Sequence, residues 1–187
     1  MSECRLLEES GRAHFMTRRF DRDGNLKHHL QTLCALAHLD YKQKATHDYN
    51  QYLQMIRHLD LDPQELEEAF RRIAFNVMAR NCDDHTKNLS FLLPQGGPWQ
   101  LAPAYDVSYA FNPAGEWTYQ HLMSVDGKFK DISRDDLLVV ADRFGIGTAP
   151  KLLKSVRDAV AEWPDFAHEA GLNDKDQSRI RENHSLL

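Results

Sequence analysis

The densest polar segment of this chain reads Asn81-Cys82-Asp83-Asp84-His85-Thr86-Lys87-Asn88. Only Cys82 in this segment is apolar, whereas the residues on both sides show the apolar spacing of buried elements. A charged loop between two apolar elements is usually a solvated turn, so its composition alone does not make it a functional site. What matters is which other side chains the neighbouring elements bring close to it.

The residues before the polar segment predict an amphipathic helix. Asp62 is a suitable N-cap, Pro63 suits the first helical position, and Glu65 predicts a capping box with Asp62. Apolar side chains then recur at helical spacing, at Leu66, Phe70, Ile73 and Val77. One face of this helix is therefore expected to be buried, and the helix leads to the polar segment.

The residues after the polar segment predict a β-hairpin. Two apolar runs, 89–93 and 99–101, flank the turn sequence Pro94-Gln95-Gly96-Gly97-Pro98. Because both strands advance by about 3.3 Å per residue, the second strand returns the chain to the neighbourhood of Asn88. Asp106 follows that strand, so we expect Asp83, Asn88 and Asp106 to converge.

These three side chains offer only oxygen ligands, which Mg²⁺ prefers together with water and phosphate oxygens. Phosphoryl transfer of the protein-kinase type uses a loop Asp as proton acceptor, followed by an Asn and a second Asp on the metal. Asp83 lies five residues before Asn88 and Asp84 only four, so Asp83 is the better candidate for the base. Lys87 is expected to stabilise charge on the transferred group. His85 either belongs to the site or holds the loop backbone.

The first third of the chain combines strand and helix patterns. Residues 1–26 predict one or two strands that end at the turn Asp23-Gly24-Asn25. Apolar stripes over 30–37 and 49–59 then predict two amphipathic helices.

The last third of the chain predicts helices. Ser133 and Asp136 predict a capping box at the start of one helix. Thr148 predicts the cap of a second helix that ends at Pro164, and a third is expected over 173–181. The chain as a whole therefore predicts one mainly helical domain with one small hairpin.

Composition limits the class of protein. The 187 residues include 42% hydrophobic residues, which is enough for a core, and carry a net charge of −5, which disfavours non-specific nucleic-acid binding. Three cysteines without a CxxC spacing favour a reducing cytoplasm over a disulfide framework. No apolar run approaches the roughly 20 residues that cross a bilayer, so no membrane contact is expected.

The sequence resembles the C-terminal lobe of a known family, the HipA-like serine/threonine kinases of bacterial toxin–antitoxin systems. The motifs that carry the resemblance lie between residues 15 and 181 and are Arg19-Phe20-Asp21-Arg22, Phe75-Asn76-Val77, the polar segment with Leu89-Ser90-Phe91, Trp99-Gln100-Leu101-Ala102-Pro103-Ala104-Tyr105-Asp106, Gly127-Lys128-Phe129, Arg143-Phe144-Gly145-Ile146 and Val160-Ala161-Glu162-Trp163-Pro164. The resemblance implies a mainly α, protein-kinase-like C-terminal lobe whose hairpin carries the catalytic loop. It also implies ATP and Mg²⁺ as cofactors.

The resemblance also implies roles for individual residues. Asp83 matches the catalytic base, and Asn88 and Asp106 match the two magnesium ligands. His85 and Lys87 match residues of the catalytic loop near the nucleotide phosphates, so His85 counts both as catalytic and as nucleotide-binding.

Four further positions match the nucleotide site of the family. Arg18 and Phe20 match the inter-lobe hinge that holds adenine, Asp21 matches a residue near the ribose, and Tyr105 precedes the second magnesium ligand. In the family the substrate is a protein hydroxyl, and the type member acts on an aminoacyl-tRNA synthetase, the glutamyl enzyme. The partner is a small helix-turn-helix antitoxin, HipB, which binds the DNA, so we expect no direct nucleic-acid contact here. A bacterial cytoplasmic location is implied.

The chain departs from the family at its N-terminal side. Fewer than 20 residues precede the hinge, and the nine glycines form no GxGxxG phosphate loop. Arg18 also replaces the hinge acid of the type member. Residues 1–26 are therefore expected to be a remnant of the N-lobe strand and hinge, and residues 27–187 the C-terminal lobe. The chain is then a fragment, a kinase that needs a complementary N-lobe polypeptide, or a degenerate kinase.

Two other functions remain open. A metal-dependent phosphohydrolase would use Asp83, Asp84, His85 and Asp106 as a mixed ligand set. A non-catalytic interaction module would instead use the helical lobe to bind an antitoxin or a complementary lobe.

Overall fold

The computed structural model describes residues 1–187 and has seven helices and nine short strands. The helices are α1 (Leu33–Leu36), α2 (Tyr49–His58), α3 (Pro63–Met78), α4 (Arg134–Arg143), α5 (Ala149–Ala161), α6 (Trp163–Glu169) and α7 (Asp174–Asn183). The strands are β1 (Cys4–Glu9), β2 (Arg12–Thr17), β3 (Arg22–Asp23), β4 (Leu26–Lys27), β5 (His29–Thr32), β6 (His47–Asp48), β7 (Ser90–Leu93), β8 (Gln100–Leu101) and β9 (Met123–Ser124). The fold is mixed α/β, so the expectation of a helical domain with one hairpin was incomplete. None of the helices combines the length and the apolar composition needed to cross a membrane.

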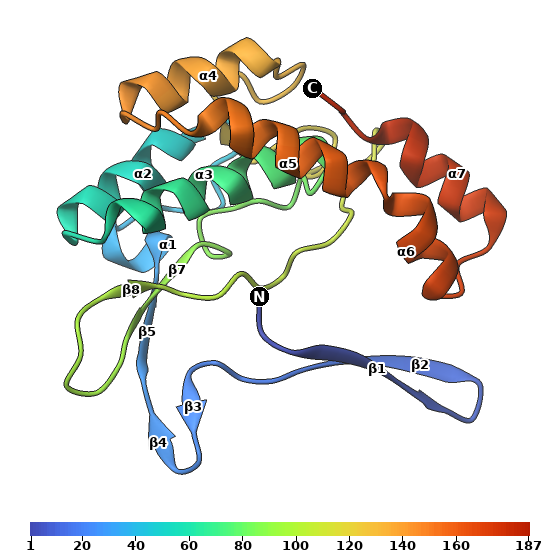
Figure 1. The fold of residues 1–187 in the computed structure, drawn as a ribbon, viewed down its shortest axis with the longest axis horizontal. Coiled ribbons are helices and arrows are strands. Elements are labelled where there is room, and N and C mark those ends of the chain that lie inside the picture. The colour runs from blue at the N-terminus through green and yellow to red at the C-terminus, as the bar shows by residue number, and fades with distance from the viewer.

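Helix α3 runs through the centre of the molecule (Figure 1). The backbone N–H of Gln64 donates to the side chain of its N-cap, Asp62, at 2.8 Å, as the sequence predicted. The predicted capping box is absent, because the carboxylate of Glu65 accepts from the backbone N–H of Leu101 at 3.4 Å instead. This contact attaches the first turn of α3 to β8.

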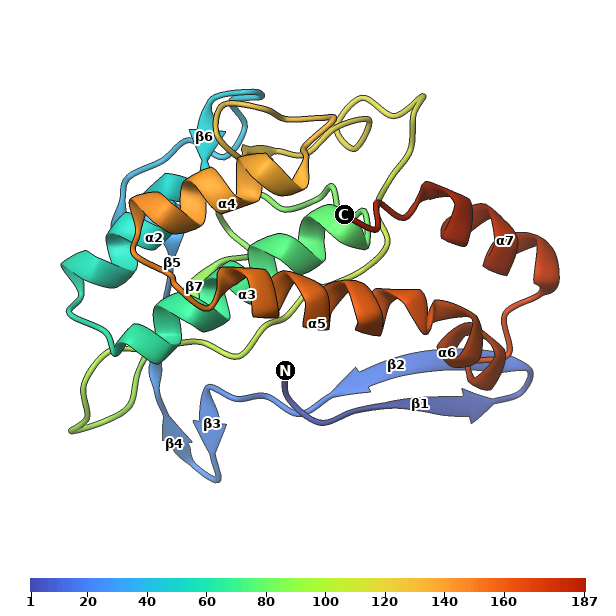
Figure 2. The same cartoon turned by 45° about the horizontal axis from the view of Figure 1, so that its top comes forward.

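The core lies between α2, α3, α4, α5 and the central sheet. The predicted face of α3 is buried, with Phe70 and Ile73 fully enclosed, and α3 packs along α5 (Figure 2). Leu153 and Val156 of α5 belong to the same apolar cluster as Tyr52 of α2. One continuous core therefore fixes the end of α3 from which the polar segment starts.

The predicted hairpin is the centre of a three-stranded antiparallel sheet in the order β5-β7-β8. Strand β5 pairs with β7, with Leu30 opposite Leu92 and Thr32 opposite Ser90. The helix expected over 30–37 was therefore wrong in its first part, and only the single turn α1 follows. The ladder to β7 decides this, because it satisfies backbone groups that a short helix would leave unpaired.

Two small hairpins form the N-terminal part. Strands β1 and β2 pair around Ser10-Gly11, where both residues have positive φ, and this hairpin lies below α6 in the view of Figure 1, outside the helical core. Strands β3 and β4 pair around the predicted turn Asp23-Gly24-Asn25. Strand β4 begins at residue 26, so the second hairpin continues past the expected boundary between residues 26 and 27. The division of the chain at this boundary stays a prediction.

The C-terminal helices begin at the predicted caps, but Thr148, the N-cap residue of α5, makes no side-chain capping hydrogen bond. The predicted capping box of α4 is present, with the backbone N–H of Ser133 donating to Asp136 at 2.8 Å. Lys128 and Ser133 donate to the Asp136 carboxylate and lower its pKa to about 2. The sequence did not predict α6, because Pro164 was expected only to end α5. Instead, Pro164 lies in the first turn of α6, where a proline is tolerated because backbone N–H groups there have no partner within the helix.

We expect Phe70→Ala to lower the free energy of unfolding by about 3–5 kcal/mol, because it removes a fully buried ring from α3 and leaves a cavity. Urea denaturation would measure the change. Phe166→Ala is the matched control, since 56% of that residue is exposed and its loss should change stability by less than about 0.5 kcal/mol. Similar losses in both variants would contradict the placement of α3 in the core.

Candidate functional site

The polar segment begins where α3 ends. Arg80 adopts a φ of 58°, a left-handed conformation that is uncommon for a residue with a side chain and that turns the chain away from the helix axis. The backbone N–H of Asn81 then donates to the Asn76 carbonyl at 2.9 Å, and the Asn81 side chain donates to Asn76 Oδ1 at 3.0 Å. These two bonds attach the start of the loop to the last turns of α3.

Asp84 is turned into the protein and is only 1% exposed. Its carboxylate accepts hydrogen bonds from the Tyr49 hydroxyl and the Leu122 backbone N–H, each at 2.7 Å. It also pairs with Nδ1 of His121 at 2.8 Å. Asn76 donates in turn to the Tyr49 hydroxyl at 2.9 Å. Asp84 therefore connects the loop to α2, to α3 and to the segment before β9.

This buried network shifts two pKa values. Burial opposes a charge on His121, but the attraction of the Asp84 carboxylate is stronger and raises the pKa of the imidazole to about 10. Burial and the same carboxylate raise the pKa of Tyr49 well above its usual value. The imidazole is therefore protonated at neutral pH, and the buried carboxylate has a charged partner.

Asp83, the predicted base, is oriented differently from its neighbour. Its side chain is 47% exposed, and Nε2 of the His85 ring lies 3.9 Å from its Oδ1. The Asn88 amide donates to the backbone carbonyl of Asp83 at 3.0 Å. That bond uses the Asn88 nitrogen and leaves its Oδ1 available as a ligand.

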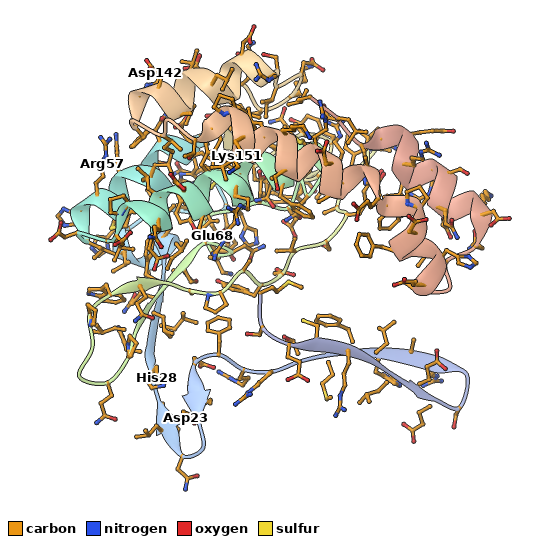
Figure 3. The ribbon with its side chains drawn as sticks, in the orientation of Figure 1. Asp23, His28, Arg57, Glu68, Asp142 and Lys151 are labelled. Atoms are coloured by element: carbon orange, nitrogen blue, oxygen red, sulfur yellow. The ribbon has the colours of Figure 1, made fainter.

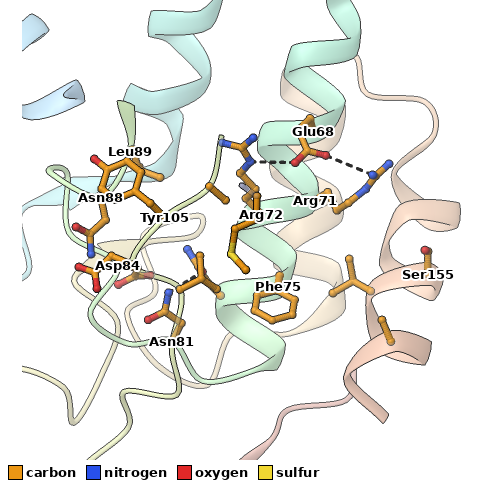
Figure 4. Close-up of a pocket in the computed structure, with 17 residues that line it drawn as sticks. Glu68, Arg71, Arg72, Phe75, Asn81, Asp84, Asn88, Leu89, Tyr105 and Ser155 are labelled. Carbon is orange, nitrogen blue, oxygen red and sulfur yellow. Dashed lines mark hydrogen bonds and ion pairs between the residues drawn. The ribbon is translucent and has the colours of Figure 1, made fainter. Parts of the chain in front are cut away.

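The predicted metal ligands lie in one pocket. Asn88 and Asp106 line a cavity of about 460 Å³ between the polar segment, α3 and α5. Figure 4 shows Asn88 and Tyr105 on one side of it and Ser155 of α5 on the other. Asp106 is exposed and has a φ of 53°, a conformation that Asp tolerates better than most residues. Asp83 does not line this cavity.

Tyr105 attaches Asp106 to the polar segment. Its hydroxyl donates to the Lys87 carbonyl and also bonds to Ser90 Oγ, both at 2.5 Å. Burial raises the pKa of Tyr105, so the hydroxyl stays protonated and can donate. The return of the chain predicted from the hairpin is therefore held by a specific hydrogen bond.

A second pocket of about 520 Å³ lies on the other side of Tyr105 and Asp106. The predicted hinge residues Arg18, Phe20 and Asp21 line it, and the Phe20 and Tyr105 rings are 5.9 Å apart. Tyr105 and Asp106 thus belong to both pockets. The predicted hinge residues and the predicted magnesium ligands are therefore adjacent.

Asp21 is the buried acid of this second pocket, with only 8% of its surface exposed. Arg19 donates two hydrogen bonds to its carboxylate, at 2.8 Å and 2.6 Å, and Arg22 forms an ion pair with it at 2.5 Å. The hydrogen bonds from Arg19 lower the pKa of Asp21. The carboxylate therefore stays charged and holds Arg19, which lines the pocket, and Arg22 beside it.

His85 and Lys87 lie outside both pockets. The Lys87 ammonium lies 3.9 Å from the centre of the Tyr41 ring, a cation–π contact, and the His85 ring lies edge-on to the same ring at 5.9 Å. Nδ1 of His85 is buried without a hydrogen-bond partner. Tyr41 lies far from the polar segment in sequence, and no motif pointed to it.

The ligand set of the phosphohydrolase alternative is not assembled. Asp84 borders the same cavity as Asn88 and Asp106, but its carboxylate is buried and is already bonded to Tyr49, Leu122 and His121. No group of three or more His, Cys, Asp or Glu side chains is close enough to hold a metal ion. The structure therefore does not support Asp83, Asp84, His85 and Asp106 as one metal-ligand set.

Comparison with known proteins places the chain in a family. The sequence model of the HipA-like C-terminal domain matches residues 1–182. The chain belongs to this HipA-like family. A chain in the solved complex of HipA, HipB and operator DNA from Shewanella oneidensis MR-1 is also similar in structure, with a TM-score of 0.70 at 20% identity. The fold of this HipA-like domain is therefore that of HipA, a kinase-like fold.

The HipA-like domain is shorter than these relatives. The structural match includes 97% of this chain but only 48% of the Shewanella chain. A Haemophilus influenzae protein named "Putative kinase" is 33% identical over 101 residues, which are 49% of this chain and 29% of that protein. The chain thus spans about half of the solved relative at most.

We expect the Asp84–His121 pair to make stability depend on pH. Folding raises the His121 pKa from 6.5 to about 10, so its contribution is fully present below pH 6.5 and is lost as the pH rises through 10. Thermal unfolding over this range should show the free energy of unfolding falling by at most about 1.4 kcal/mol per pH unit.

His121→Gln should flatten this dependence, whereas the exposed control His14→Gln should leave it unchanged. An NMR titration of the His121 ring would measure its pKa directly. An ordinary pKa, or an unchanged slope in His121→Gln, would contradict the proposed charge state.

Proposed function

We propose that this HipA-like domain is the catalytic-loop part of a protein serine/threonine kinase, the toxin of a toxin–antitoxin system, which transfers the γ-phosphate of ATP to a protein hydroxyl. The observation that carries the proposal is the pair of pockets that meet at Tyr105 and Asp106. One contains the oxygen ligands expected for Mg²⁺, and the other contains the residues expected to hold a nucleoside.

The residues of the first pocket fit Mg²⁺. The hydrogen bond from Asn88 to the Asp83 carbonyl uses the amide nitrogen, so Oδ1 of Asn88 remains available to a metal. The Asp106 carboxylate is exposed and forms no ion pair. Such ligands suit a hard cation that keeps several waters and phosphate oxygens. When bound, the ion would neutralise charge on the β- and γ-phosphates.

The second pocket would hold the nucleoside. We place adenine against Phe20 and Arg18, with the Tyr105 ring beyond them, and the ribose hydroxyls near Asp21. The lowered pKa of Asp21 keeps it an acceptor for a sugar hydroxyl. The phosphates would then extend past Asp106 toward the polar segment.

Asp83 would receive the proton in the transfer step. The substrate hydroxyl oxygen attacks the γ-phosphorus while the bond to the leaving ADP oxygen breaks, and the hydroxyl proton passes to Asp83. The Asp83 carboxylate has no Lys or Arg partner to neutralise it. Lys87 would leave the Tyr41 ring to reach the transferred group, and His85, 3.9 Å from Asp83, would help to orient the carboxylate.

The partners of this domain belong to the same proposal. The 187 residues contain no GxGxxG phosphate loop. We therefore propose that a complementary N-lobe, on a partner polypeptide or a longer chain, covers the nucleotide. A HipB-like helix-turn-helix antitoxin is the second proposed partner, and the similarity to a chain in a complex with HipB and operator DNA supports it. The proposed substrate is a protein such as an aminoacyl-tRNA synthetase, in the bacterial cytoplasm.

One observation favours a non-catalytic interaction module as the second candidate. The β1–β2 hairpin exposes Leu6, Leu7 and Phe15, the last to 68%. Exposed apolar side chains on a protruding hairpin are typical of protein contacts. Nucleotide binding separates the two candidates.

We expect the 187-residue chain to bind ATP in the presence of Mg²⁺, and Asp106→Asn to weaken this binding at least about tenfold because the metal loses a charged ligand. Asn tolerates the left-handed backbone at this position, so the variant should fold. Isothermal calorimetry would measure the affinity. The exposed control Asp23→Asn, on the β3–β4 hairpin (Figure 3), removes the same charge and should bind like the wild type.

With an N-lobe polypeptide added, Asp83→Asn should keep nucleotide binding but slow phosphate transfer by about 10²–10⁴-fold, because it loses the proton acceptor. Transfer of labelled γ-phosphate to a protein substrate would measure the rate. ATP binding that ignores Asp106→Asn would refute the metal site, and equal transfer by Asp83→Asn would refute the base.

A further inference from the structure

A third cavity, of about 230 Å³, lies behind the polar segment and is lined by polar side chains. Its walls come from the end of α3 with Arg80, from the segment that contains His121 and Asp131, and from residues 183–185. The backbone N–H of Ser185 donates to the Met78 carbonyl at 2.9 Å, which fixes the last wall against α3. The cavity is smaller than the roughly 300–1,000 Å³ that hold drug-sized ligands, so it suits a small ion or group.

Arg80 supplies this cavity with a cation that lacks a counter-ion. Its guanidinium lies 4.2 Å from the centre of the Phe111 ring, and its Nε is buried without a hydrogen-bond partner. No carboxylate forms an ion pair with it. A buried donor without a partner is costly, and a planar guanidinium binds oxyanions well because it can donate two parallel hydrogen bonds.

His121 supplies a second cation to the same cavity. The ring is 1% exposed and lines the cavity, and Asp84 occupies its Nδ1. The other nitrogen, Nε2, makes one long hydrogen bond, of 3.9 Å, with the Cys82 sulfur. Because Asp84 raises the His121 pKa, both ring nitrogens carry protons at neutral pH, and Nε2 is a donor that could exchange this long bond for a phosphate oxygen.

The acidic group in the lining is Asp131, which is exposed and pairs with neither cation. His184 and Ser185 add neutral polar groups to the wall. Asp84 already neutralises His121, so the Arg80 guanidinium is the cation in this cavity without a carboxylate partner, and it favours an anion there.

We propose that this cavity is a phosphate-binding site, in which the Arg80 guanidinium and Nε2 of His121 hold the oxygens of a phosphate group. The phosphate is either inorganic phosphate or the phosphorylated side chain of a polypeptide. The site is separate from the two pockets of the proposed kinase chemistry, and its ligand would stabilise the backbone turn at Arg80 from which the polar segment starts.

NMR of the ¹⁵N-labelled chain, with EDTA to remove Mg²⁺, tests this proposal. Titration with inorganic phosphate should shift the Arg80 Nε–H signal with saturation in the millimolar range or below. Arg80→Met should weaken the affinity at least tenfold. The control Arg181→Met removes the same charge from an exposed position on α7 and should leave the affinity unchanged.

Asp131→Asn tests the same cavity without removing a donor. It removes the opposing charge, and Asn suits the φ of 52° at this position, so the variant should fold and bind phosphate about 3- to 10-fold more tightly. A phosphoserine peptide that inorganic phosphate displaces would identify a phosphorylated side chain as the ligand. Phosphate binding without peptide binding would identify the free ion.

Three results would overturn the proposal. They are the absence of saturable phosphate binding, an equal loss of affinity in Arg80→Met and Arg181→Met, and an unchanged affinity in Asp131→Asn. None of these measurements uses ATP or Mg²⁺, so failure of the phosphate site and failure of the kinase proposal are distinguishable.

Discussion

The polar segment depends on one buried charge, the carboxylate of Asp84. A carboxylate removed from water must be paired and hydrogen-bonded, and Tyr49, Leu122 and His121 meet this requirement from two separate parts of the chain. Removing one partner would leave a charge unpaired in the core, so the network holds the loop in one arrangement. Asp83, one residue earlier, is consequently left at the surface with its carboxylate free.

Tyr105 has the corresponding role on the other side of the site. Its hydroxyl holds the chain after β8 against the polar segment, and its ring separates the two larger pockets. Asp106 therefore directly follows a residue whose hydroxyl is held by two hydrogen bonds. The hydrogen bonds of Asp84 and of Tyr105 thus position the exposed carboxylates on which the proposed chemistry depends.

Local sequence signals predicted the elements that are stabilised locally. The caps at Asp62 and Ser133 and the hairpin around residues 94–98 formed as expected, because their partners lie within a few residues. The errors arose where distant partners compete. Leu30 lies in a strand because β7 is available to pair with it. The Glu65 carboxylate accepts a hydrogen bond from the Leu101 backbone instead of capping its own helix.

The sequence by itself determined the family, the helix before the polar segment and the candidates Asp83, Asn88 and Asp106, because these depend on short motifs and spacing. Only the tertiary structure decided which neighbouring carboxylate is buried, because the partners of Asp84 lie 35 and 37 residues away at Tyr49 and His121. Spacing within a motif carries no information about contacts over such separations. The same reason explains why the cavity behind the polar segment could be found only in the folded chain.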